Sequence, residues 1–230
     1  MMTRLRAFHG DPKVKRFYLM RVRQHRANDE LIKGVYWQEG KGCAIGCAIH
    51  SDDHAAYETE LGIPRLLARL EDGIFEGLPM AQAQRWPEAF LRAIPVGADL
   101  SMVWPQFAVW LLGDPKDGVL RSAKNPTTRH AIQAVIRLYQ GLSTWPPSRE
   151  EAALFAEAAE AANAAWAAEA ADAAKAADAA NAAWAADAAW AAGARVQQSN
   201  TLLSLLRAAP VVEEPMVSHV GDGGMLERSG

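Results

Sequence analysis

Both cysteines of the chain and two of its six histidines lie within one twelve-residue segment, residues 43–54. Thiol and imidazole groups bind soft metals and act as nucleophiles or bases near neutral pH. This segment is therefore the part of the chain where chemistry is most strongly indicated. Its reactive residues are Cys43, Cys47, His50 and His54.

The spacing of these four residues fits a metal site only in part. On one helix they share a face, but they extend over about 16 Å along it. Zinc needs each ligand atom within about 2.0–2.3 Å, so a straight helix cannot supply all four ligands unless it breaks at Gly46 or Ser51. Neighbouring pairs such as His50 and His54 can bind one metal ion together. Glu71 or Asp72 of the next helix would then be an additional ligand. The cofactor that this segment could hold is a zinc ion. Its predicted ligands are Cys43, Cys47, His50, His54 and Glu58.

A second interpretation uses Cys43 as a nucleophile. The cysteine follows two glycines and Lys41 at the predicted start of a helix, where the helix dipole and the lysine favour a thiolate. Gln38 is placed to stabilise an oxyanion. The same glycine loop is compatible with an anion site or with an ordinary turn. The base that such a nucleophile needs would be His130 or His25.

Each of these side chains also fits a structural role. A small cysteine packs well in a core, and a neutral histidine is frequently a hydrogen-bonded core residue. The sequence therefore leaves a metal site, a thiol nucleophile and a core-facing stripe as open alternatives.

Helix start and stop signals predict the elements that position this segment. Asp11 followed by Pro12 predicts a helix over 12–27. A second helix is predicted from Gly42 to Leu61, ended by Gly62 and Pro64. Little of the chain alternates with period two, although residues 34–37 fit a short strand or an extended loop. We therefore expect an all-α multi-helix bundle. Further helices are predicted over 64–72, 79–94 (interrupted at Trp86-Pro87), 100–112 (central and buried on most sides) and 126–142.

An alanine-rich segment follows the predicted core. From Glu157 to Gly193 every third residue is not alanine, and nearly all the others are. Alanine has the highest helix propensity, so we expect a long helix from Ser148 to about Val196, followed by a separate Leu-rich helix at 201–207. Alanine surfaces allow close helix packing, here on the core or on a second copy. The expected organisation is a disordered lead (1–11), a helical core domain (12–145), an alanine-rich part with the Leu-rich helix (146–208) and a disordered tail (209–230).

Charge and composition limit the classes of function. The net charge of −3 argues against a dedicated nucleic-acid-binding protein. Residues 1–41 carry a net charge of +6 and residues 150–230 one of −8, so the two parts can attract each other within a chain or between copies. No signal peptide or membrane span is indicated, and two cysteines four residues apart do not form a disulfide framework. We therefore expect a cytoplasmic protein.

Four stretches of the chain resemble a family of bacterial and phage-borne proteins. They are residues 34–47, which include Gly-Lys-Gly-Cys-Ala-Ile-Gly-Cys, and residues 57–64, 70–76 and 99–104. Members of that family often end in a repetitive alanine-rich helix and a short Leu-rich helix, and the likeness covers about residues 12–208. No activity is established for the family, so the resemblance assigns no role to any residue. It implies an accessory or mobile-element context.

The sequence thus predicts a helical binding or interaction protein whose partner is a second copy or another protein, without membrane or nucleic-acid partners. The alternative is an enzyme that uses Cys43 as a nucleophile or a metal held by His50 and His54.

Overall fold

The computed structural model describes residues 5–143, 147–154 and 184–212 of the chain. Within these ranges the chain is mostly helical, and its one sheet is a two-stranded antiparallel hairpin. The predicted all-α multi-helix fold is therefore confirmed. The helices are α1 (Pro12–Ala27), α2 (Ala44–Ile49), α3 (Ala56–Leu61), α4 (Arg65–Gly77), α5 (Met80–Ala83), α6 (Trp86–Ala93), α7 (Val103–Gly113), α8 (Pro126–Gly141) and α10 (Trp184–Ala208), with β1 (Trp37–Gln38), β2 (Lys41–Gly42) and the 3-10 turns η1 (Ala7–Gly10) and η2 (Val119–Arg121).

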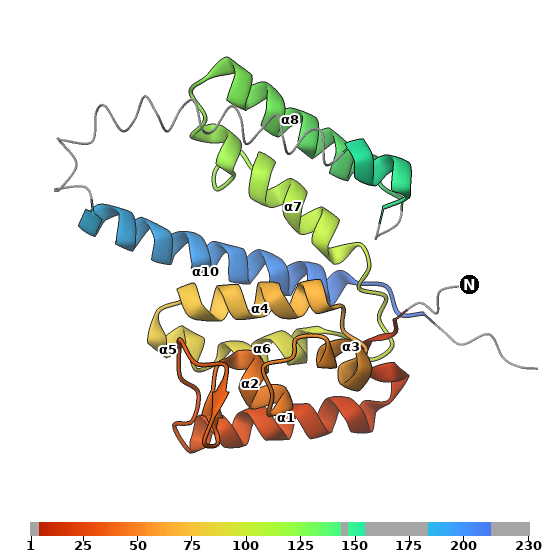
Figure 1. Ribbon diagram of the computed structural model, residues 1–230, viewed down its shortest axis with the longest axis vertical. Coiled ribbons are helices and arrows are strands. Elements are labelled where there is room, and N and C mark those ends of the chain that lie inside the picture. Colours follow the sequence, from red (N-terminus) through yellow and green to blue (C-terminus); the bar gives the residue numbers. More distant parts are fainter. Residues whose placement is uncertain (1–4, 144–146, 155–183, 213–230) are drawn as a thin grey trace, which may run out of the picture.

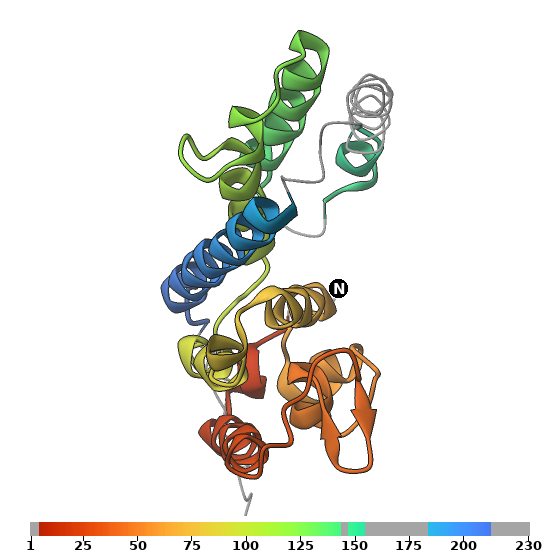
Figure 2. The ribbon, with the colours of Figure 1, turned by 90° about the vertical axis from the view of Figure 1, so that its left-hand side faces the viewer.

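The helix α10 crosses the middle of the molecule and joins its two parts (Figure 1). On one side it contacts α4 and α6, and α1, α2, α3 and the hairpin lie beyond them. On the other side it contacts α7, which packs along α8. The side view shows the same order of layers (Figure 2).

Local capping signals explain the helices that the sequence predicted best. The Asp11 carboxylate accepts a hydrogen bond from the Lys13 amide at 2.7 Å, and the Asn125 side chain accepts one from the Thr127 amide at 2.8 Å. A proline follows each cap in the first turn of α1 and α8. Gly62 adopts a left-handed conformation (φ 63°) and ends α3 as predicted.

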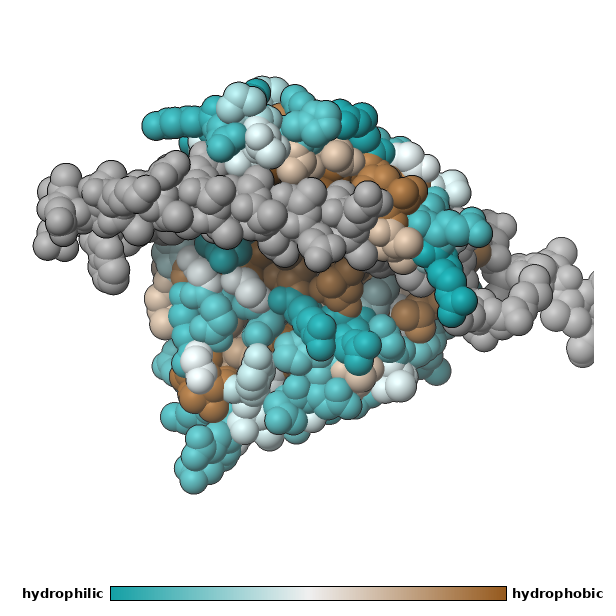
Figure 3. Space-filling view, turned by 45° about the horizontal axis from the view of Figure 1, so that its top comes forward, coloured by the Kyte–Doolittle hydropathy of each residue, from teal (hydrophilic) through white to brown (hydrophobic). Residues whose placement is uncertain are grey.

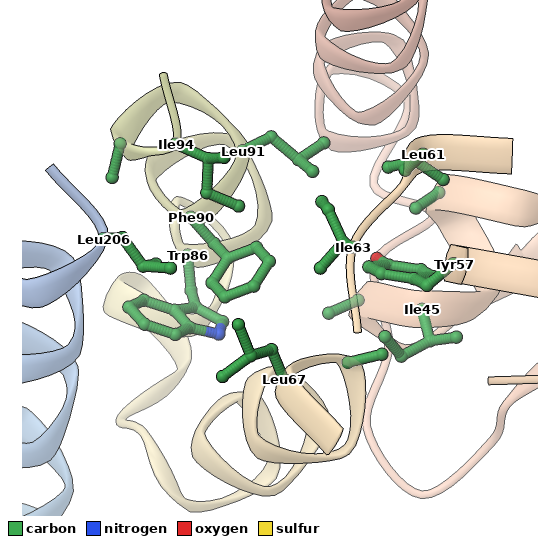
Figure 4. Close-up of a cluster of buried hydrophobic side chains, with 14 of the residues drawn as sticks. Ile45, Tyr57, Leu61, Ile63, Leu67, Trp86, Phe90, Leu91, Ile94 and Leu206 are labelled. Atoms are coloured by element: carbon green, nitrogen blue, oxygen red, sulfur yellow. The ribbon is translucent and has the colours of Figure 1, made fainter. Parts of the chain in front are cut away.

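The core forms where α2, α3, α4 and α6 converge (Figure 4). The ring of Tyr57 lies between Ile45 and Ile63, and all three residues are fully buried. From α10, Leu206 reaches Trp86 of α6. Burying side chains of this size stabilises the fold by about 1.5–3 kcal/mol each, which anchors the end of α10 to the core.

The prediction of one helix from Gly42 to Leu61 is wrong, because the chain leaves the helix at His50. This residue is left-handed (φ 57°, ψ 38°) and ends α2. A polar turn follows, in which the Ser51 hydroxyl accepts from the Asp53 amide and the Asp53 carboxylate accepts from the Ala55 amide. These local hydrogen bonds compete with the helical ones and separate α2 from α3.

Both expected disordered ends are partly ordered. The sequence predicts a disordered lead over residues 1–11, yet Phe8 is fully buried, and the Ala7 amide donates to the Ala98 carbonyl at 3.0 Å. At the other end the Asp99 amide donates to the Pro210 carbonyl at 2.8 Å. The two end segments are therefore held by the same loop, residues 97–99. The rest of the expected tail, residues 213–230, lies outside the described residues.

The second half of the chain differs from expectation in two ways. The predicted separate Leu-rich helix at 201–207 is the continuous end of α10, which packs on the core. The helix α7 is not buried on most sides, since Val109, Trp110 and Leu111 are only half-buried. A space-filling view shows apolar residues gathered in patches near the middle of the molecule (Figure 3). Residues 155–183 of the alanine-rich segment lie outside the described part. None of the described helices has the length and apolar character needed to cross a membrane.

Candidate functional site

The glycines of the 40–47 segment bring the hairpin directly against α2. A Cβ on Gly46 would lie 1.6 Å from the carbonyl oxygen of Tyr36, and one on Gly42 would lie 2.1 Å from the same atom. The Cys43 amide donates to the carbonyls of Val35 and Tyr36, at 2.8 and 3.2 Å. That amide is therefore used by the hairpin and is not free for an anion. The glycines serve a close backbone approach here.

The two thiols lie inside the core. Cys43 is 1 % exposed and Cys47 is fully buried. Burial, followed by the neighbouring Asp72 carboxyl, raises the pKa of Cys43, which is the opposite of the shift that a nucleophile needs. Burial raises the pKa of Cys47 to about 12, and its thiol donates to the Gly42 carbonyl at 3.3 Å. Both cysteines thus act as small core residues.

The other residues proposed for thiol chemistry are placed apart from that thiol. Gln38 and Lys41 face each other as register partners in the hairpin, and both are exposed. His130 lies on α8, in the layer beyond α10. The predicted set of Cys43, Gln38 and Lys41 therefore shares no accessible site.

The predicted metal ligands are likewise divided. The break after α2 separates His50 from His54, whose Nε2 lies 3.9 Å from the Asp72 carboxylate and whose ring meets Tyr36 edge-on. The Glu58 carboxylate accepts a hydrogen bond from the Arg65 amide at 2.9 Å. No cluster of three metal-binding side chains occurs in the part of the chain that the structure describes. Zinc stays a prediction, which metal analysis of the purified chain would test.

Beneath the thiols lies a buried acidic cluster. Glu71 is fully buried, as is Tyr57, and Asp72 is 9 % exposed. The Tyr57 hydroxyl lies beside the Glu71 carboxyl. Among the described residues, neither carboxyl oxygen of Glu71 has a hydrogen-bond partner of good geometry. Burial raises the pKa of Glu71 well above its usual value, and the neighbouring Asp72 raises it further. Burial therefore favours the protonated form of Glu71 over the carboxylate.

A histidine pair forms the accessible part of the site. Nε2 of His25, in the last turn of α1, lies 2.8 Å from Nε2 of His50. Nδ1 of His25 lies 2.6 Å from a carboxylate oxygen of Glu30. The ring of Trp37 stacks on His50 at 4.5 Å between centroids and 11° between planes. The array of Glu30, His25 and His50 was not predicted, although His25 was named as a base.

Hydrogen-bonding rules give one consistent set of donors and acceptors along this array when His25 is a neutral imidazole. The Glu30 carboxylate accepts from Nδ1–H of His25. Nε2 of His25 then accepts from Nε2–H of His50. This leaves Nδ1 of His50 as a bare acceptor, and no other hydrogen bond to this ring occurs among the described residues. Burial, then Arg21 and His25, lower the pKa of His50, which keeps the ring neutral at pH 7.

The array opens into a pocket of about 450 Å³, here called the α1 pocket. His25 is buried, whereas His50 is exposed. His50, one of the residues that line the pocket, has a positive φ (57°) without being glycine. Such conformations cost energy and gather at functional sites, so this one supports a site here. The walls include Phe17, Met20, Arg21, Glu30, Trp37 and His50.

Comparison of the chain with protein-family models, with curated proteins and with solved structures gives no match. The resemblance described above therefore stays a prediction, and function has to be argued from the site itself.

Proposed function

We propose that the chain is a helical binding protein that associates with a second copy through the exposed face of α1. One observation carries this proposal. Phe17 and Met20 are 52 % and 67 % exposed, lie one helical turn apart and border the α1 pocket. Large apolar side chains that are exposed beside a pocket are typical of interaction surfaces.

Charge favours a second copy as the partner. The face of α1 that carries Phe17 and Met20 also carries the exposed Lys13 and Arg16. Residues 150–187 of the same sequence hold eight acidic residues against one lysine. A second copy thus brings an acidic segment of the chain to α1, and attraction of this kind accelerates association and sets its orientation.

The alternative partner is another protein of acidic character, in line with the accessory context that the sequence resemblance implies. The free, buried thiols of Cys43 and Cys47 support a reducing compartment, as in the cytoplasm. The rival proposal of a thiol enzyme loses support because Cys43 is buried and its pKa is raised.

Light scattering after size exclusion tests the proposal on the full chain. We expect a mass near twice the monomer's 25.0 kDa in low salt, and a lower mass in high salt because charge attraction is screened. Met20→Ser removes an apolar contact and weakens the dimer roughly tenfold or more. Met80→Ser is the matched control, because Met80 is 53 % exposed on a different element, and it leaves the dimer unchanged. A wild-type monomer at all concentrations contradicts the proposal.

A further inference from the structure

We propose that Nδ1 of His50 is a general base that activates water or a hydroxyl held in the α1 pocket for attack on an acyl ester. The proposal shares Phe17 and Met20 with the surface proposed for self-association, but it concerns the Glu30–His25–His50 array and its own chemistry. It rests on two observations, the hydrogen bonds of 2.6 and 2.8 Å and the adjoining pocket, and on the proton arrangement that leaves Nδ1 of His50 as an acceptor.

The array suits a base because it holds one tautomer. A neutral imidazole whose Nε2–H is engaged presents its other nitrogen as an acceptor. The stack on Trp37 fixes the plane of the ring, and the edge of His25 meets both rings at about a right angle. His25 and Glu30 are therefore positioning residues that act through His50. A base held in this way contributes about 10²–10⁴-fold to a proton transfer.

The proposed reaction is the hydrolysis of an ester by water. Nδ1 of His50 takes a proton from water while the water oxygen bonds to the acyl carbon. The Nε2 proton of His50 shifts toward His25, and the Nδ1 proton of His25 shifts toward Glu30. The ester C–O bond then breaks, the alcohol leaves with a proton returned along the same path, and the acid is released. Arg21, which also lines the pocket, supplies positive charge for the developing oxyanion.

The pocket indicates a small ester with an aromatic group. Its apolar walls are Phe17, Met20 and Trp37, which suit stacking and edge contacts with an aromatic ring. A volume of about 450 Å³ holds a small molecule and not a folded partner. The probe that meets this description is 4-nitrophenyl acetate.

The rate of 4-nitrophenyl acetate hydrolysis tests the base directly. His50→Asn removes the base, and asparagine tolerates the left-handed conformation at this position, so the variant keeps its fold. We expect the second-order rate constant to fall at least tenfold. The other histidines remain in the variant and set the background rate. A variant that hydrolyses the ester as fast as the wild type overturns the proposal.

Glu30→Gln tests the positioning part. A glutamine side chain can donate as well as accept, so the tautomer of His25 is no longer fixed, and the rate falls roughly tenfold or more. Glu39→Gln removes the same charge from the exposed hairpin turn and leaves the rate unchanged. Equal rates for Glu30→Gln and the wild type contradict the relay.

The pH dependence of the rate and the tautomer of His50 are two further measurements. Neither would change if Glu30 had only a structural role. The rate rises with pH as His50 loses its proton. The midpoint lies below the usual histidine pKa, because burial, Arg21 and His25 outweigh Glu60 and Glu30 around the ring. Glu30→Gln moves the midpoint lower still. Imidazole ¹⁵N NMR of the wild type should show the proton of neutral His50 on Nε2; a proton on Nδ1 overturns the proposal whatever the rate.

Discussion

At the scale of single residues, Glu71 shows that one buried carboxyl makes stability depend on pH. Burial raises its pKa in the folded chain above the ordinary value of 4.5. The folded chain therefore keeps a proton that the unfolded chain releases once the pH exceeds about 4.5. The contribution of Glu71 to stability is complete below that pH and is lost as the pH rises, by up to about 1.4 kcal/mol per pH unit.

Glu71→Gln should remove this loss, because an amide carries no charge to desolvate. We expect the free energy of unfolding of the variant to exceed that of the wild type at pH 8 and to approach it at pH 5. Urea unfolding at the two pH values measures the difference. Glu39→Gln, at an exposed position, is the control and should run parallel to the wild type. Parallel curves for Glu71→Gln would show that Glu71 is ionised at little cost.

At the scale of elements, the contact between the hairpin and α2 depends on the missing side chain of Gly46. Gly46→Ala would place a methyl group 1.6 Å from the Tyr36 carbonyl oxygen, so the hairpin must move. We expect a loss of about 3 kcal/mol or more in the free energy of unfolding, measured by chemical denaturation. Gly73→Ala is the matched control, since nothing lies within 4 Å of that position in α4. It should stabilise the chain by up to about 1 kcal/mol. If both variants were equally stable, the close packing of the hairpin would be disproved.

Helices that end on local signals could be predicted from the sequence, and helices that end on distant contacts could not. Asp11-Pro12, Gly62 and Asn125-Pro126 each carry their cap or stop signal within a few residues, and α1, α3 and α8 begin or end there. The break at His50 is followed by local hydrogen bonds of Ser51 and Asp53, but the side chain of His50 contacts His25, which is 25 residues away. No local pattern encodes that partner.

At the scale of the whole molecule, the fold decides which of the reactive residues can react. The sequence pointed to the 43–54 segment and named His25 as a base, but it placed the thiols and imidazoles on one helix face. In the folded chain, Cys43 and Cys47 are buried in the core beside α4, whereas His50 is exposed at the end of α2. The array with Glu30 joins α1, its following loop and α2, so it exists only once these elements are packed together.

The central claim is that the reactive group of the 43–54 segment is an imidazole and that its thiols are part of the core. To test this, separate samples of the native chain are exposed briefly to iodoacetamide or to the histidine reagent diethyl pyrocarbonate. Peptide mapping then identifies the modified residues. We predict modification of His50 in the native chain, with Cys43 and Cys47 alkylated only after unfolding. Rapid alkylation of Cys43 in the native chain, with His50 unmodified, would contradict the account.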